Sequence, residues 1–162
     1  MSRFILIEDE FGYGLKDQLT DQRALRIDFA SAQLTHRRLH GGKRELLFKA
    51  VKAKPGCKVW DCTAGLGVDS FLLAAQGCEV TLFERSNVLA LLLEQALAAA
   101  MTDESIGKIA QRMHLKKMDA IKLLGADFGL MSQTEMPDVI LIDPMFPTRR
   151  KSARVKGEMQ IL

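Results

Sequence analysis

The sequence predicts an α/β fold organised around a doubly wound, mostly parallel sheet. Three observations support this prediction. Short β-rich runs alternate with helical runs along the chain, a glycine turn follows an early strand, and the last strand is apolar throughout. A repeated strand–helix order is typical of a parallel sheet. A continuous apolar strand is expected where helices cover both faces of such a sheet.

The N-terminal part of the chain gives weaker signals. We expect an N-terminal segment at 1–42, followed by the main domain at 43–162. Within the segment, residues 4–7 are expected to form a strand and 12–14 a turn. An amphipathic helix is expected at 44–53, because its apolar residues recur at helical spacing.

From residue 58 onward the expected elements alternate regularly. Strands are expected at 58–61, 79–83, 113–117 and 138–142, and helices at 69–76, 87–101, 102–111 and 120–124. Gly77 suits the end of the first of these helices, because glycine readily adopts the left-handed conformation found there. Ser86 or Asn87 suits the start of the next, because a short polar side chain can accept a hydrogen bond from an exposed helical N–H.

The sequence stops 19 residues after Asp143, before the second half of a doubly wound sheet. The strand at 138–142 would then form a long apolar edge, which natural proteins avoid because it invites aggregation. We therefore expect a fragment of a longer protein, or a sequence from which the later strands were omitted. A swapped or paired partner strand is the alternative.

Composition excludes several classes of protein. Apolar residues make up 48% and charged residues 27%, an ordinary balance for a globular domain. No apolar run reaches the roughly 18 residues of a membrane-spanning helix, and acidic residues come too early for a secretory signal. We expect a cytoplasmic protein that does not enter a membrane. Cys57, Cys62 and Cys78 lack metal-ligand spacing, so neither a metal nor a disulfide is predicted.

A glycine turn after the strand at 58–61 is the first candidate binding motif. Asp61 ends the strand, and Gly65 and Gly67 let the backbone approach a ligand closely. A dinucleotide site is one alternative, but Ser70 stands where its third glycine belongs. The acidic Asp61 suits an amino-bearing ligand better than a pyrophosphate. S-adenosylmethionine carries an ammonium and a sulfonium without phosphate, so it is the predicted cofactor; a purely structural turn is the other alternative.

Two further strand ends carry candidate cofactor contacts. Glu84 ends the next strand, where a carboxylate can accept hydrogen bonds from both ribose hydroxyls. Asp119 and Ala120 follow the strand at 113–117, where a side chain could bind the adenine amino group. The alternative for Asp119 is a helix N-cap.

The motif Asp143-Pro144-Met145-Phe146-Pro147 follows the last apolar strand directly. It resembles the (D/N/S)-P-P-(Y/F) signature of amino-group methyltransferases. The Asp143 side chain and the Pro144 carbonyl can both accept hydrogen bonds from an exocyclic amine, whose lone pair is otherwise delocalised into the base. Phe146 offers a flat surface for stacking of an extruded base, worth about 1–3 kcal/mol. A proline-rich turn without catalytic function is the alternative.

Basic clusters flank these motifs, although the net charge of +3 alone does not indicate a nucleic-acid partner. Candidate contacts to RNA phosphates are Arg37, Arg38, Arg149, Arg150 and Lys151. Solvated loops are the alternative interpretation of both clusters. Polar and basic groups at 36–42 could also close over the methionine end of the cofactor, and a loop packed on the sheet edge is the alternative for this stretch.

Together these motifs resemble the RsmJ family, the bacterial small-subunit ribosomal RNA guanine-N2 methyltransferases. The similar stretch covers most of residues 27–159. The resemblance implies a Rossmann-like class I S-adenosylmethionine-dependent methyltransferase fold and formation of N2-methylguanosine in 16S ribosomal RNA, free or in the small ribosomal subunit. Cofactor contacts implied by the resemblance are Val68, Asp69, Glu84, Arg85, Asp119, Ala120 and Asp143.

Two other functions remain open at this stage. An adenine-N6 methyltransferase would use the same Asp-Pro motif, because both reactions modify an exocyclic amine. A non-catalytic RNA-binding assembly factor could keep the fold without the reaction. An NAD-linked oxidoreductase fits poorly, because of Ser70 and the motif at Asp143.

Overall fold

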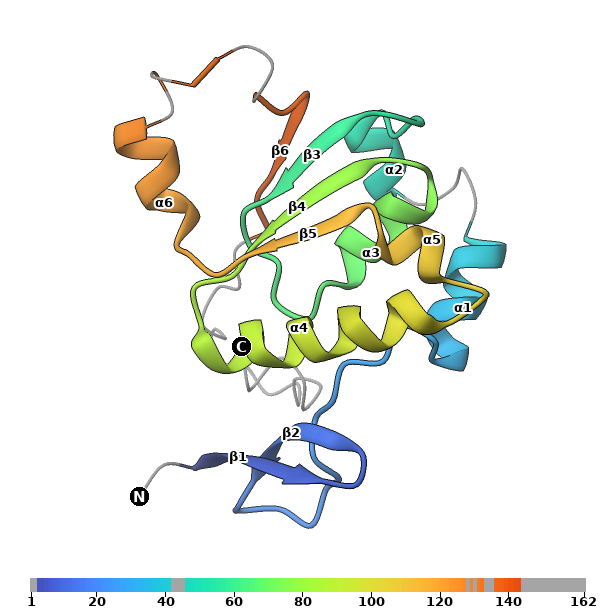
Figure 1. The fold of residues 1–162 in the computed structure, drawn as a ribbon, viewed down its shortest axis with the longest axis vertical. Coiled ribbons are helices and arrows are strands. Elements are labelled where there is room, and N and C mark those ends of the chain that lie inside the picture. The colour runs from blue at the N-terminus through green and yellow to red at the C-terminus, as the bar shows by residue number, and fades with distance from the viewer. Residues whose placement is uncertain (1–2, 42–45, 128, 130, 133–135, 144–162) are drawn as a thin grey trace, which may run out of the picture. The chain divides into compact units, whose positions relative to one another are not determined.

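The computed structural model describes residues 3–41, 46–127, 129, 131–132 and 136–143 of the chain (Figure 1). These residues belong to two compact units. The first unit contains the chain up to Arg26 together with Asp143, and the second is Ile27–Ile142. In the described part of the chain, no helix has the length and apolar character needed to cross a membrane.

The N-terminal unit is built on a β-hairpin. Strand β1 (Phe4–Asp9) pairs antiparallel with β2 (Gly12–Asp17), which confirms the strand expected at 4–7. The prediction of a turn at 12–14 is wrong, because the chain reverses at residues 10–11 and residue 12 already begins β2. Gly14 lies inside β2, where an added Cβ would come within 3.0 Å of the Ala24 side chain. Glycine at this position therefore allows the segment that contains Ala24 to pack closely against β2.

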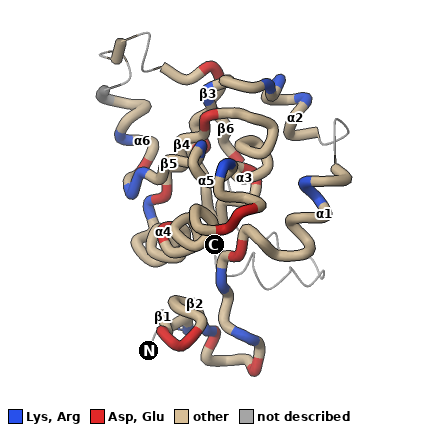
Figure 2. Tube along the Cα trace, turned by 45° about the vertical axis from the view of Figure 1, so that its right-hand side comes forward, with Lys and Arg blue, Asp and Glu red and all other residues tan. Residues whose placement is uncertain are grey.

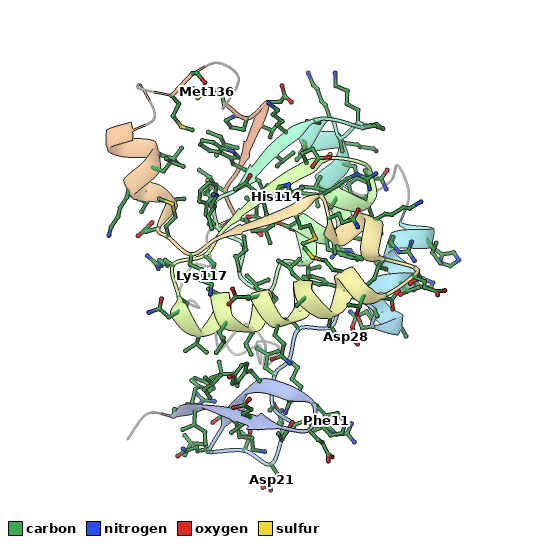
Figure 3. The ribbon with its side chains drawn as sticks, in the orientation of Figure 1. Phe11, Asp21, Asp28, His114, Lys117 and Met136 are labelled. Atoms are coloured by element: carbon green, nitrogen blue, oxygen red, sulfur yellow. The ribbon has the colours of Figure 1, made fainter. Side chains whose placement is uncertain are left out.

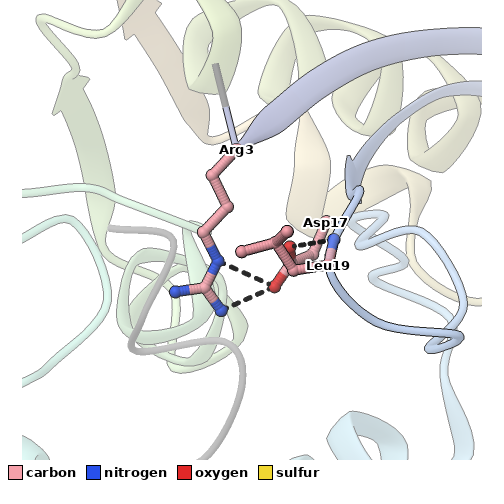
Figure 4. A network of polar contacts seen from close by, with 3 residues as sticks. All are labelled: Arg3, Asp17 and Leu19. Carbon is pink, nitrogen blue, oxygen red and sulfur yellow. Dashed lines mark hydrogen bonds and ion pairs between the residues drawn. The ribbon is translucent and has the colours of Figure 1, made fainter. Parts of the chain in front are cut away.

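An ion pair closes the open end of the hairpin (Figure 4). Asp17 accepts hydrogen bonds from Arg3 Nε at 3.0 Å and Nη2 at 2.6 Å, and from the Leu19 amide at 3.0 Å. These hydrogen bonds lower the pKa of the Asp17 carboxyl below its usual value, and those from the Arg3 guanidinium have the largest effect. Because the Arg3 side chain is 43% exposed, solvent screens much of the pair's contribution to stability.

The second unit contains a four-stranded parallel sheet, in the order β5-β4-β3-β6. Its strands are β3 (Lys58–Asp61), β4 (Glu79–Phe83), β5 (Met113–Lys116) and β6 (Val139–Leu141). The chain first moves outward from β3 through β4 to β5, and then returns to the other side of β3. The predicted doubly wound sheet is thereby confirmed, and its switch point lies between β3 and β6.

Helices connect these strands and precede them. They are α1 (Ala32–His40), α2 (Leu46–Val51), α3 (Val68–Ala75), α4 (Asn87–Thr102), α5 (Gly107–Ala110) and α6 (Ala120–Lys122), the last continuing as a π-helical turn, η2 (Leu123–Asp127). The helices expected at 69–76 and 87–101 are confirmed. Of the two candidate caps for α4, Ser86 is the one used, since its side chain accepts from Leu89 N.

Two of the helical expectations need correction. The loop that was the alternative for 36–42 is wrong for residues 36–40, which belong to α1. The helix expected at 102–111 is only the short α5, because the Asp103 side chain accepts hydrogen bonds from Ser105 N and Ile106 N and ends α4 there. This local turn competes with helix continuation.

Apolar side chains fill both faces of the sheet, and Figure 3 draws them. Val59, Leu82 and Met113 belong to the main core with residues of α3 and α4. Trp60 and Phe83 belong to a smaller cluster that includes residues of α6, and their rings meet edge to face at 5.4 Å. Successive residues of a strand point to opposite faces, which explains this division.

The main core extends into the chain before α2. Phe29 is 2% exposed and stacks on Phe71 with ring centroids 5.1 Å apart, while Leu34 of α1 joins the same cluster. Residues 27–40 therefore pack in the second unit. The domain boundary expected at residue 42 stays a prediction.

Candidate functional site

The carboxyl ends of the central strands meet at one edge of the sheet. Cys62 N, just after β3, donates to Leu141 O at the end of β6, with 3.0 Å between the atoms. Ala64 N donates to Phe83 O at the end of β4, at 3.3 Å. Ligands of open α/β sheets bind outside this edge, at the switch point. The loop after β3 therefore begins where such a ligand is expected.

Asp61 holds the start of the glycine turn. Its side chain is 3% exposed; Oδ1 accepts from Thr63 N at 3.1 Å and Oδ2 from Ser70 Oγ at 2.6 Å. A buried carboxylate needs such donors, because its loss of hydration is otherwise costly. Ser70, which occupies the position of a third glycine, thus ties α3 back to the end of β3. From the sequence, Ser70 only argued against a dinucleotide site, and nothing indicated its hydrogen bond to Asp61.

The two glycines of the turn have positive φ angles, +53° at Gly65 and +71° at Gly67. At Gly67 a Cβ would also lie 2.8 Å from Leu93 Cδ2 and 3.2 Å from Phe29 Cζ. Glycine is therefore required both by the backbone conformation and by the packing around it. Val68 then opens α3, and Asp69 lies in its first turn.

Glu84 supports the same turn from the neighbouring strand. It is 8% exposed; Oε2 accepts from Gly65 N at 3.0 Å and Oε1 from Ser86 N at 2.7 Å. The structure thus joins two motifs separated by 19 residues in the chain. Arg85 follows on the exposed side.

Asp119 caps α6, where its Oδ1 accepts from Ile121 N at 3.0 Å. The N-cap interpretation is confirmed, and a contact with adenine stays a prediction. Ala120 is 5% exposed and packs in the cluster of Trp60 and Phe83. Ala120 therefore packs against the strand ends of β3 and β4.

Asp143 follows Ile142 directly and is exposed. Five of the residues predicted for catalysis or RNA contact lie outside the described residues, namely Pro144, Phe146, Arg149, Arg150 and Lys151. Their roles stay predictions.

An ion pair connects α1 to the glycine turn. Arg37 Nη2 lies 3.7 Å from Asp69 Oδ1, and both side chains are 38% exposed. Arg38 is the next residue on α1 and is half-buried. The sequence placed these arginines in a basic cluster, but it contained no signal that one of them faces α3.

The cysteines are free thiols, and two of them, Cys57 and Cys78, are buried. Burial, followed by the negative charge of Asp61, raises the pKa of the Cys62 thiol to about 11. This thiol is protonated at neutral pH and is a poor nucleophile. Among the described residues, no group of three or more His, Cys, Asp or Glu side chains could hold a metal ion.

Comparison with known proteins identifies the class. The chain belongs to the family described as "Putative SAM-dependent methyltransferase", which it matches over residues 2–162. The expected fold class is confirmed, and S-adenosylmethionine is the cofactor of this family.

Two similar relatives carry the same name. The chain is 47% identical over 141 residues to ribosomal RNA small subunit methyltransferase J of Dechloromonas aromatica, covering 85% of the chain and 56% of that protein. It is 44% identical over 154 residues to the protein of the same name from Stutzerimonas stutzeri, covering 91% and 58%. The resemblance to the RsmJ family is thereby confirmed. The chain spans about half the length of these relatives.

Two solved structures are similar to the chain. A SAM-dependent methyltransferase from Neisseria gonorrhoeae is 34% identical, with a TM-score of 0.71 over 87% of this chain and 56% of that one. A SAM-dependent methyltransferase from Agrobacterium tumefaciens is 22% identical with a TM-score of 0.50, covering 89% of this chain and 40% of that one, and is similar in fold alone.

Proposed function

We propose that the protein transfers a methyl group from S-adenosylmethionine to the exocyclic N2 amino group of a guanosine in 16S ribosomal RNA. The observation that carries the proposal is the contact between Glu84 and Gly65 N at 3.0 Å. It puts an acidic strand end beside the glycine turn at the edge where class I cofactors bind. The relatives' names support small-subunit ribosomal RNA as the substrate.

The residues at this edge fit the predicted cofactor. Each oxygen of a carboxylate can accept two hydrogen bonds. Glu84 Oε1 accepts from Ser86 N and Oε2 from Gly65 N. A second acceptor position on each oxygen is then suited to a ribose hydroxyl. The carboxylates Asp61, Asp69 and Glu84 around the turn favour a cationic ligand over a phosphate.

The bound cofactor would supply a methyl group on a sulfonium, and the chain's own residues would prepare the acceptor. The Asp143 carboxylate and the Pro144 carbonyl would accept hydrogen bonds from the two N–H bonds of the guanine amine. This arrangement favours a pyramidal nitrogen, with its lone pair directed at the methyl group. Phe146 would stack on the base. After transfer the nitrogen loses a proton, which water or the Asp143 carboxylate can accept.

The RNA contacts are expected to come from basic residues on more than one element. In the part of the chain that the structure describes, lysines and arginines of the second unit are spread over several elements and do not gather on one of them (Figure 2). The candidates from the sequence, Arg37, Arg38, Arg149, Arg150 and Lys151, therefore stay hypotheses for phosphate contact. A cytoplasmic location is a prediction that follows from a ribosomal substrate.

Methyl transfer tests this function directly. The protein is incubated with S-adenosylmethionine carrying a labelled methyl group and with small ribosomal subunits or 16S ribosomal RNA, and the RNA is digested to nucleosides. We expect label in N2-methylguanosine, lost in Asp143→Ala and retained in the control Asp21→Ala, an exposed residue of the N-terminal unit. Label in N6-methyladenosine would favour the adenine alternative. RNA binding without affinity for S-adenosylhomocysteine would favour the assembly factor.

A further inference from the structure

An exposed ion pair between α1 and α3 is longer than a charge-assisted hydrogen bond. Arg37 Nη2 and Asp69 Oδ1 are 3.7 Å apart, and each side chain is 38% exposed. A charge-assisted hydrogen bond between such groups is about 2.7–2.9 Å long. An exposed ion pair of this kind contributes little to folding. The two charges therefore lie near each other without a short hydrogen bond between the paired atoms.

Packing fixes where this pair lies. Phe29 stacks on Phe71 of α3, and its Cζ is 3.2 Å from the position of a Cβ on Gly67. Leu34 of α1 is buried in the same core. Arg37 is three residues after Leu34, so it lies on the same side of α1. The segment that carries Arg37 is thus anchored against the glycine turn.

The other carboxylates of the turn are buried and hydrogen-bonded. Asp61 accepts from Thr63 N and Ser70 Oγ, and Glu84 accepts from Gly65 N and Ser86 N, as described above. Both of these carboxylates are buried. Asp69 differs from them, because it is partly exposed and faces a cation. The pair of Arg37 and Asp69 therefore presents one charge of each sign to solvent beside the turn.

We propose that Arg37 binds the carboxylate of the amino-acid end of S-adenosylmethionine while Asp69 binds its ammonium. This amino-acid end is a zwitterion, and a guanidinium beside a carboxylate has the complementary arrangement of charges. The guanidinium fork binds carboxylates in two parallel hydrogen bonds. The loose ion pair separates when the cofactor enters, and each member gains a partner of opposite charge. This inference rests on the proposed function and gives Arg37 a role in cofactor selection in place of RNA contact.

Three adenosyl ligands separate the two contacts by calorimetry. S-adenosylhomocysteine carries both charges, decarboxylated S-adenosylmethionine lacks the carboxylate, and 5′-methylthioadenosine lacks the whole amino-acid end. Arg37→Gln is expected to weaken S-adenosylhomocysteine binding about 10- to 100-fold, the usual effect of losing hydrogen bonds to a charged group. The same variant should leave the affinity for the other two ligands unchanged within about twofold.

Asp69→Asn provides the complementary measurement. It should weaken both ligands that carry the ammonium and leave 5′-methylthioadenosine unchanged. Arg112→Gln is the matched control, since Arg112 is also 38% exposed and forms a loose pair with Glu79 at 3.9 Å. Glu79 is the first residue of β4, and Arg112 directly precedes β5. This pair therefore lies at the amino ends of the strands, opposite to the edge with the glycine turn. All three affinities should remain as in the unaltered protein.

Each contrary outcome has a separate meaning. An equal loss of all three ligands in Arg37→Gln would show that Arg37 only shapes the turn, and would overturn the inference. Unchanged ligand affinities together with weaker RNA binding would assign Arg37 to RNA and also overturn it. If the unaltered protein bound none of the three ligands, the cofactor assignment of the proposed function would itself fail.

Discussion

Replacing Ser70 by alanine removes a donor from a buried carboxylate without disturbing any large side chain. Ser70 is 0% exposed, and its Oγ donates to Asp61 Oδ2 at 2.6 Å. A hydrogen bond to a charged group contributes about 1.5–3 kcal/mol, and burial here leaves no water to replace the donor. Alanine is the better helix former by about 0.5 kcal/mol. We therefore expect the free energy of unfolding to fall by about 1–2.5 kcal/mol.

Urea denaturation followed by the fluorescence of Trp60 measures this change. Trp60 is the single tryptophan of the chain and precedes Asp61 in β3, so its signal follows the strand in question. Ser105→Ala is the matched control. Ser105 Oγ donates to Asp103 Oδ1 over the same 2.6 Å, but at an exposed site, so its loss should cost less than about 0.5 kcal/mol. Equal effects in the two variants would refute the argument that burial of Asp61 makes its hydrogen bond valuable.

Two further predictions concern the same turn. Gly67→Ala should lower the free energy of unfolding by about 2–4 kcal/mol, because it combines a positive φ of +71° with a Cβ 2.8 Å from Leu93 Cδ2. The same urea experiment measures it, and a loss below about 1 kcal/mol would contradict the packing argument. Cys62 should react slowly with iodoacetamide, because a pKa of about 11 leaves about 1% thiolate at pH 9, where a thiol of pKa 9 is half ionised. Peptide mass spectrometry should show the rate rising up to pH 11; equal rates in folded and urea-unfolded protein at pH 9 would exclude the raised pKa.

Much of the parallel sheet could be predicted from local pattern. The bounds expected for β3 and β4, 58–61 and 79–83, agree with the structure residue for residue. Both strands are β-rich runs preceded by turn-forming residues, and a helix follows each. Local signals and the final packing agree here, which is where sequence reasoning is most reliable.

Other elements depend on contacts that no local pattern contains. Helix α1 carries polar residues along most of its length, and the sequence leaves a loop open for 36–42; the burial of Leu34 beside Phe29 is a tertiary contact. Gly12 and Gly14 suggested a turn because glycine is common there. Gly14 is needed instead because Ala24 passes next to it.

The sequence by itself determined that a glycine turn and two acidic strand ends would meet at one edge of a parallel sheet, because parallel strands bring all their carboxyl ends to the same side. Only the tertiary structure decided which atoms these groups contact. Glu84 accepts a hydrogen bond from Gly65 N, and Ser70 donates one to Asp61. Arg37 forms an ion pair with Asp69. Such partners are set by how the helices pack on the sheet, since residues 9 or 19 positions apart have no fixed relation along the chain alone.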